Sequence, residues 1–173
     1  MRSCATSSCP RSDPARPVNR DAAAATAAAA AAAAEQDITF RSRRWVRPED
    51  LNANGSLFGG SLLRWIDEEA AIYAILQLGN PRAVTKFISE IDFVSSAVQG
   101  DLIEMGLRAT GFGRTSLTMR AEVRNMVTRR SILAIDRIVF VSLDESGAPV
   151  PHGYSTITYD RDRLPGQAGE GAA

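Results

Sequence analysis

The chain has 173 residues, of which 20 are lysine or arginine and 20 are aspartate or glutamate, so its formal net charge is zero. This length fits one domain with a sizeable core, and the charge balance gives no support for nucleic acid as the main partner. The only histidine is His152, and the two cysteines, Cys4 and Cys9, lie near the N-terminus. That distribution excludes a zinc site of the usual Cys/His spacing and a disulfide framework. Carboxylates, amides, hydroxyls and main-chain donors are left for any hydrolytic chemistry.

Residues 1–35 differ in composition from the rest of the chain. Serine, arginine and proline dominate the first twenty residues, and a run of alanine broken only by Thr26 follows. Alanine favours helix, but this run is too short and too weakly apolar for a membrane span, and a secretory signal needs a stronger apolar core. We predict a disordered tail with no catalytic role. We expect a cytoplasmic protein, with organellar targeting by this tail as the alternative.

One folded domain is expected over residues 36–160, with a flexible tail over residues 161–173. Apolar and polar residues interleave at residues 38–46, which predicts a first strand. The apolar stretch at residues 58–78 predicts a long helix that ends at Gly79-Asn80-Pro81. Apolar side chains lie on nearly all sides of this helix, which is typical of a helix covered by other structure.

Beyond Pro81 the apolar residues follow strand spacing. Strands are predicted at residues 83–94, 102–109, 116–123 and 132–143, with turn sequences between them. Every second residue from Leu117 to Val123 is apolar, which predicts an antiparallel sheet with one solvent-exposed face and one face on a core. A single sheet must then cover a single helix. An antiparallel sheet that curls around the helix, an α+β arrangement, satisfies both patterns.

The segment from Asn52 to Asp67, NANGSLFGGSLLRWID, is the strongest candidate for a site. A polar turn leads into Gly59 and Gly60, and Asp67 follows on the helix eight residues after Gly59. Main-chain N–H groups at a helix N-terminus can bind a developing negative charge, and a carboxylate can act on a water molecule beside that charge. We expect Asp67 to be buried, because its neighbours on the helix are apolar.

This segment resembles the signature of hotdog-fold acyl-CoA thioesterases, in the branch of the bacterial and cytosolic animal acyl-CoA hydrolases. The resemblance covers about residues 38–144 and implies a curved antiparallel sheet wrapped around one central helix. Supporting pieces occur in the expected order at Ala83-Val-Thr85, Asp92-Phe93, Gly100-Asp101 and Gly113-Arg-Thr-Ser116. The chain departs from the branch at Ser56, where an acidic or amide residue is common, at Glu68-Glu69, where small residues are frequent, and at Ser95-Ser96-Ala97, where proline is often found.

The resemblance implies hydrolysis of an acyl-CoA thioester to a carboxylic acid and CoA. The Gly59 N–H would bind the thioester oxygen, and Asp67 would be the general base or the nucleophile. Asn52 would orient the water or the carbonyl, and Thr85 would deliver a hydroxyl across a dimer interface. The candidates for substrate contacts are Asn54, Phe58, Gly60, Arg114 and Ser116, with Arg114 and Arg108 as candidates for the CoA phosphates.

The resemblance further implies a homodimer or a trimer of dimers, with the site between two protomers. No cofactor is expected, because CoA is part of the substrate, and no metal, nucleic acid or membrane span is expected either. Hotdog dehydratases use a histidine in their site, and none lies near the predicted helix, which argues against that reaction. A non-catalytic acyl-CoA-binding protein of the same fold is the alternative. The alternative for these residues is a purely structural role, in which Asn54-Gly55 forms a turn and Gly59-Gly60 only allows close packing.

Overall fold

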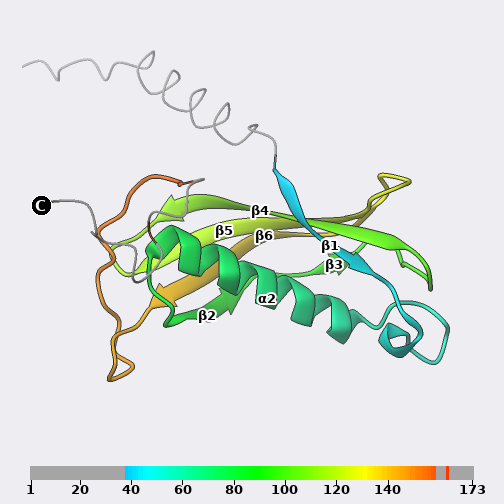
Figure 1. Ribbon diagram of the computed structural model, residues 1–173, viewed down its shortest axis with the longest axis horizontal. Coiled ribbons are helices and arrows are strands. Elements are labelled where there is room, and N and C mark those ends of the chain that lie inside the picture. Colours follow the sequence, from blue (N-terminus) through cyan, green and yellow to red (C-terminus); the bar gives the residue numbers. More distant parts are fainter. Residues whose placement is uncertain (1–37, 159–162, 164–173) are drawn as a thin grey trace, which may run out of the picture. The chain divides into compact units, whose positions relative to one another are not determined.

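The structure, a computed structural model, describes residues 38–158 and Arg163, so the predictions for residues 1–35 lie outside it. Within the predicted C-terminal tail it describes Arg163, whose guanidinium donates to the main-chain oxygens of Gln77 and Thr156. The elements, labelled where there is room in Figure 1, are β1 (Phe40–Trp45), η1 (Pro48–Asp50), α2 (Gly59–Leu78), β2 (Ala83–Ile88), β3 (Asp92–Phe93), β4 (Leu102–Phe112), β5 (Ser116–Asn125) and β6 (Ser131–Ser142).

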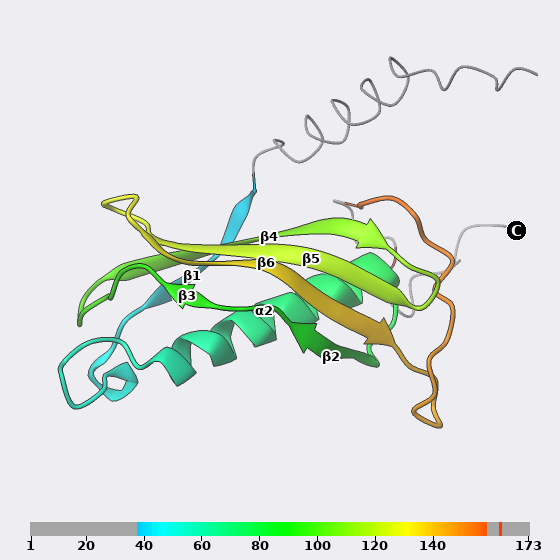
Figure 2. The ribbon, with the colours of Figure 1, turned by 180° about the vertical axis from the view of Figure 1, so that it is seen from behind.

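The strands form one antiparallel sheet in the order β1-β4-β5-β6-β2, and β3 pairs with β6 beyond the end of β2. Figures 1 and 2, which view the molecule from opposite sides, show α2 lying along one face of this sheet. The predicted fold class is confirmed. One predicted strand, residues 83–94, is split into β2 and β3. The end of β2 and β3 share one register on β6, with Ile88 opposite Ile138 and Asp92 opposite Ala134.

Both helix ends follow from local sequence. Gly79 caps the C-terminus in the left-handed conformation, with φ of 62°, a conformation that glycine adopts without steric cost. The N-cap is Phe58, which has extended backbone angles, so the helix begins one residue later than predicted. Phe58, which the sequence placed in the helix, has a side chain that is 55% exposed.

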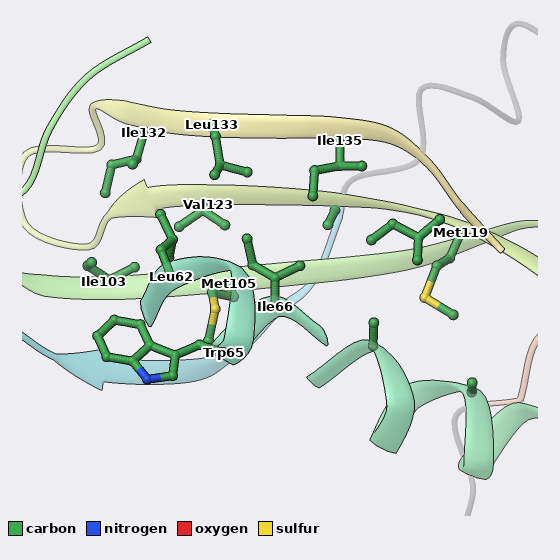
Figure 3. Close-up of a cluster of buried hydrophobic side chains, with 14 of the residues drawn as sticks. Leu62, Trp65, Ile66, Ile103, Met105, Met119, Val123, Ile132, Leu133 and Ile135 are labelled. Atoms are coloured by element: carbon green, nitrogen blue, oxygen red, sulfur yellow. The ribbon is translucent and has the colours of Figure 1, made fainter. Parts of the chain in front are cut away.

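The core lies between α2 and the inner face of the sheet. Figure 3 shows Leu62, Trp65 and Ile66 of the helix against Ile103, Val123 and Leu133 of the strands. Along β5 every second side chain from Leu117 to Asn125 is buried, as the alternation predicted for Leu117 to Val123. Each fully buried large apolar side chain stabilises the fold by about 1.5–3 kcal/mol.

The side of α2 that faces away from the sheet is open in the chain taken alone. Ile72 is 52% exposed there, and Asp67 is exposed as well. The prediction that Asp67 is buried is therefore wrong for a single chain. The physical reason is that one sheet face covers only one side of a helix, so the apolar residues on the other side need a second surface.

On the outer face of the sheet, the carboxylate of Glu104 is buried between two arginines. Its side chain is 5% exposed, Arg124 Nε donates to its Oε1 at 2.6 Å, and Arg129 forms a second ion pair with it. Burial alone would raise the pKa of this carboxyl. The Arg124 hydrogen bond and the charges of Arg124 and Arg129 outweigh burial, so the pKa lies below its ordinary value of 4.5.

We expect Glu104→Gln to lower the free energy of unfolding at pH 7 by about 1.5–3 kcal/mol, the usual size of a hydrogen bond to a charged group. Because the folded-state pKa is lowered, this stabilisation is present above the unfolded pKa and is lost as pH falls through the folded pKa. Urea unfolding of both proteins at pH 7 and under acid conditions measures the difference. The matched control is Glu145→Gln, since Glu145 is 87% exposed in its pair with Arg82 and should change stability little. A difference in the free energy of unfolding between Glu104→Gln and wild type that stays constant with pH would contradict the expectation.

Candidate active site

The loop that enters α2 is held at several points by main-chain hydrogen bonds. Asn52 N donates to Ser56 O at 2.8 Å, Gly55 N to Asn52 O at 3.0 Å, and Leu57 N to Ala97 O at 2.8 Å. Gly55 has φ of 75°, a backbone conformation that favours glycine in a tight turn. Asn54 and Gly55 therefore form the turn that their purely structural interpretation predicted. Asn54 is exposed at its tip.

The side chain of Asn52 forms hydrogen bonds across this loop. Its Oδ1 accepts the main-chain N–H groups of Asn54 and Ser56 at 2.9 and 3.3 Å, and its Nδ2 donates to Ser56 Oγ at 2.9 Å. Asn52 is half-buried. Sequence reasoning selected Asn52 and missed Ser56, because only the turn brings the two side chains together.

The first turn of α2 offers main-chain donors. The first N–H groups of an α-helix have no partner within the helix, and Phe58 contributes no side-chain cap. A Cβ on Gly59 would lie 3.3 Å from the Phe93 ring, and a Cβ on Gly60 would lie 2.6 Å from the Phe58 ring. Both glycines are thus approached closely by aromatic rings. Beside Gly59 opens a pocket of about 330 Å³, lined by Leu57, Gly59, Leu62, Phe93, Ser95, Ser96, Ala97 and Ile132.

Asp67 lies on the open side of α2 and is held by the neighbouring strand. Thr85 Oγ1, on β2, donates to Asp67 Oδ1 at 2.6 Å, which is the short distance of a hydrogen bond to a charged acceptor. We expected the Thr85 hydroxyl to reach the site across a dimer interface. In the structure it donates to Asp67 of its own chain. The contact fixes one carboxylate oxygen, Oδ1, and involves no hydrogen bond to Oδ2.

Within one chain, Gly59 and Asp67 do not converge on a common point. They are eight residues apart on the same helix, which is about 12 Å along its axis at 1.5 Å per residue. A thioester oxygen bound at Gly59 N–H and a water activated by Asp67 must both lie within a few ångströms of one carbonyl carbon. A site that used both groups on one thioester would therefore have to take them from two chains.

Arg114 and Ser116 lie far from the start of α2. Arg114 lies in the turn between β4 and β5, and Ser116 is the first residue of β5. His152 N donates to Arg114 O and the His152 ring contacts Ser116 O, each at 3.3 Å. Ser116 pairs with Val141, near the end of β6, while the pocket beside Gly59 is lined by Ile132, near its start. Nine residues of strand separate these positions, about 30 Å at 3.4 Å per residue. Arg108 lies on β4, opposite Arg120 of β5.

Glu69, one of the two acidic residues at which the chain departs from the resembled branch, has a structural role. Glu69 is half-buried and faces Arg44 of β1, with Arg44 Nη2 3.7 Å from Glu69 Oε1 and 3.3 Å from Glu68 Oε2. No group of three His, Cys, Asp or Glu side chains among the described residues could hold a metal ion. In that same part of the chain, no helix is both long and apolar enough to span a bilayer.

Residues 54–131 match the family model of the thioesterase superfamily. The chain is 32% identical over 109 residues to an uncharacterised acyl-CoA thioester hydrolase of Bacillus subtilis, an alignment that covers 61% of this chain and 63% of that protein. It is 30% identical over 115 residues to a protein of the same description from Buchnera aphidicola, with coverage of 62% and 83%. The matched region thus spans slightly less than two thirds of the Bacillus relative and most of the Buchnera one.

Solved structures of thioesterases and acyl-CoA hydrolases are also similar to this chain. A crystal structure of a hexameric acyl-CoA thioesterase is 38% identical with a TM-score of 0.57, over 64% of this chain and 72% of that one. A hexameric thioesterase from Yersinia pestis is 28% identical with a TM-score of 0.62, over 68% and 99%. An acyl-CoA hydrolase from Staphylococcus aureus, in complex with butyryl-CoA and CoA, is 29% identical with a TM-score of 0.57, over 64% and 68%. The chain belongs to the thioesterase superfamily, in the branch of the acyl-CoA thioester hydrolases.

Proposed function

We propose that this chain hydrolyses acyl-CoA thioesters to a carboxylic acid and CoA, and that it needs no cofactor because CoA is part of the substrate. The observation that carries the proposal is the Asp67 carboxylate, held by Thr85 on the open side of α2. Asp67 acts on the thioester as general base or as nucleophile. The Thr85 hydroxyl fixes Oδ1, so that Oδ2 is the oxygen presented to water or to the carbonyl carbon.

The Gly59 N–H stabilises the oxyanion of the tetrahedral intermediate. Phe58 does not cap the helix with its side chain, so the first-turn N–H groups and the helix dipole are available to an anion. One preorganised donor of this kind lowers the barrier by about 3–4 kcal/mol.

The Staphylococcus aureus hydrolase supports this choice of residues. Its structures include single alanine variants of an asparagine, an aspartate and a threonine. The asparagine and the aspartate are fifteen residues apart, which is also the separation of Asn52 and Asp67. The threonine follows the aspartate by seventeen residues, against eighteen between Asp67 and Thr85.

A complete site needs two protomers, with Gly59 from one and the Asp67–Thr85 pair from the other. The axial separation of about 12 Å within one helix is the reason. Strand β2 ends the sheet and exposes Val84 and Phe87, so its unpaired edge and apolar side chains suit pairing with a second copy. The hexameric relatives favour a trimer of such dimers.

The test of the activity is release of free CoA from a panel of acyl-CoAs of increasing chain length. We expect turnover of at least one member of the panel. Binding of acyl-CoA without any release of CoA would overturn the proposal and favour the non-catalytic acyl-CoA-binding alternative.

The shared site predicts that two inactive variants restore activity when they are mixed. In a hybrid dimer of Gly59→Pro and Asp67→Asn, one site carries both changes and the other carries neither. Random reassembly makes half of the dimers hybrids, so we expect about a quarter of wild-type activity, since only interactions present in an intact site lower its barrier. The measurement is CoA release after joint refolding, with each variant refolded alone as control. No recovery, with hybrids demonstrated by mass spectrometry, would place both groups in one protomer.

A further inference from the structure

The turn between β5 and β6 projects from the sheet at the end where α2 begins, on the face away from the helix (Figures 1 and 2). Hydrogen bonds fix its shape, because Asn125 Oδ1 accepts the N–H groups of Val127 and Thr128 at 2.9 and 3.0 Å. Arg129 has φ of 61°, a left-handed conformation that few non-glycine residues adopt, and its guanidinium pairs with Glu104 on the outer face of the sheet. Val127 lies in the exposed part of the turn, with 71% of its surface in contact with solvent.

Trp45 is the neighbour of this turn on the sheet. It lies opposite Leu102 across β1 and β4, and Leu102 O accepts Met126 N at 2.7 Å. Leu102 is two residues before Glu104, so both side chains, and that of Trp45 opposite, point to the outer face. Trp45 is 66% exposed. A large aromatic and an aliphatic side chain are therefore both left in water at this projecting end.

Arginines surround these two apolar side chains. Arg43 lies opposite Glu104, and Glu104 lies opposite Arg124, so the three form one row across the outer face. Glu104 is buried between Arg124 and Arg129, whereas Arg43 and Arg130 are exposed and form no ion pair within the part of the chain that the structure describes. We call this surface the basic tip, and it comprises Arg43, Trp45, Arg124, Val127, Arg129 and Arg130.

The acidic side chains that border the basic tip do not cancel its charge. Glu122, two residues before Arg124, pairs with Arg120 at 2.7 Å. Asp101, which precedes Leu102, accepts Val98 N at 2.9 Å through Oδ2. The four arginines of the tip, set against Glu104 and Asp101, leave a formal charge of +2 on each chain. The surface thus combines a positive charge with exposed apolar side chains.

We propose that the basic tip docks this protein on the surface of an anionic lipid bilayer. Tryptophan favours the level of the lipid headgroups, and arginine binds phosphate groups through paired hydrogen bonds. Reversible binding to a bilayer surface becomes stable when an apolar anchor and basic residues act together. A nucleic acid would satisfy the same charges, but Val127 offers it neither a hydrogen bond nor an aromatic face. In the projecting turn, Val127 gains only by leaving water.

This docking goes beyond the proposed hydrolysis and does not depend on it. Its relation to the candidate site comes from the chain itself, since Ile132, which lines the pocket beside Gly59, follows Arg130 by two residues. A docked protein holds that pocket close to the bilayer, into which apolar acyl chains partition.

Sedimentation with lipid vesicles tests the proposal. We expect the full chain to bind vesicles of phosphatidylcholine and phosphatidylglycerol in equal amounts at least about tenfold more tightly than vesicles of phosphatidylcholine alone. Binding should weaken between about 0.1 M and 1 M salt, because salt screens the charges. The second tryptophan, Trp65, is 4% exposed, so a shift of emission to shorter wavelength on anionic vesicles reports Trp45. Absence of binding to anionic vesicles, or equal binding to both kinds, would overturn the proposal.

Substitutions locate the binding surface. We expect Arg43→Gln and Arg130→Gln each to weaken binding about fivefold, the equivalent of about 1 kcal/mol for one arginine near an anionic surface. Trp45→Ser should weaken it at least about tenfold, since a large apolar side chain is no longer buried, and should abolish the emission shift. The matched control is Arg82→Gln, because Arg82 is 52% exposed, is paired with Glu145, and precedes β2 near the far end of α2. An equal loss in this control would assign the binding to overall charge and overturn the role of the tip. Melting temperatures verify that each variant is folded.

Other occupants of the basic tip give different results. If the tip joins two copies of this chain, Trp45→Ser changes the mass measured by light scattering, and the wild type does not bind vesicles. If it takes a nucleic acid, the wild type binds a DNA duplex in preference to anionic vesicles. Either result would overturn membrane docking. Because vesicle binding is measured separately from CoA release, failure of docking leaves the thioesterase proposal untouched, and an enzyme that binds vesicles but releases no CoA fails only the latter.

Discussion

Replacing Asp67 by asparagine is expected to lower kcat by about 10²–10⁴-fold, the range for loss of a general base. The change is nearly isosteric, Asp67 is exposed in the single chain, and the Thr85 hydroxyl can still donate to the amide oxygen. We therefore expect the free energy of unfolding to change by less than about 0.5 kcal/mol, as for other surface substitutions. Initial rates of CoA release and urea midpoints, measured on the same preparations, separate the two effects.

The neighbouring carboxylate provides the matched control. Glu68 follows Asp67 on α2, is exposed, and pairs with Arg44 at 3.3 Å and Arg64 at 3.8 Å. Glu68→Gln removes the same charge from the same turn, and we expect it to keep wild-type kcat. Asp67→Asn with more than a tenth of wild-type activity, or an equal loss in Glu68→Gln, would contradict the assignment of Asp67.

Replacing Gly59 by proline is expected to lower kcat by about 10²–10³-fold, because it deletes one oxyanion donor. Gly59 is the first residue of α2, the helical position that accepts proline most readily. Phe58 has φ of −70° and ψ of 125°, which are angles suited to a residue before proline. The variant therefore removes the N–H group with little strain on the main chain. Steady-state CoA release and far-UV circular dichroism measure the outcome.

Gly59→Ala tests whether glycine is required here for its N–H group or for its close packing against Phe93. Alanine keeps the N–H, and its Cβ would lie 3.3 Å from the terminal carbon of the Phe93 ring, so the ring must move by a few tenths of an ångström. We expect Gly59→Ala to stay within a few-fold of wild type. If alanine and proline reduced activity equally, glycine would be required for contact with Phe93 and not for its donor.

Several features could be predicted from the sequence because their causes are local. The end of α2 follows from Gly79 in its left-handed conformation, and the alternation of β5 follows from residues two positions apart. The Asn54-Gly55 turn has the same kind of origin, since Gly55 adopts a positive φ. The helix-entry segment also identified Asn52, Gly59 and Asp67 as candidates, because a site built on one turn and one helix is contiguous in sequence.

Other features depend on pairing between distant segments and could not be predicted. The Thr85–Asp67 contact requires β2 to occupy the edge of the sheet beside α2. The approach of Phe93 to Gly59 requires β3 to pair with β6. Similarly, the distance between Ser116 and the start of α2 depends on the register of β5 on β6. No local pattern encodes these choices.

By itself, then, the sequence determined the elements, the antiparallel sheet over one helix and the segment that carries the candidate site, since periodicity and turn chemistry act over a few residues. The tertiary structure alone decided that Asp67 is exposed, that Thr85 of the same chain holds it, and that Gly59 lies too far away on the same helix to join it. The exposure of Asp67 follows from which face of the helix the sheet covers, and the separation of Gly59 from Asp67 follows from the helical rise of about 1.5 Å per residue.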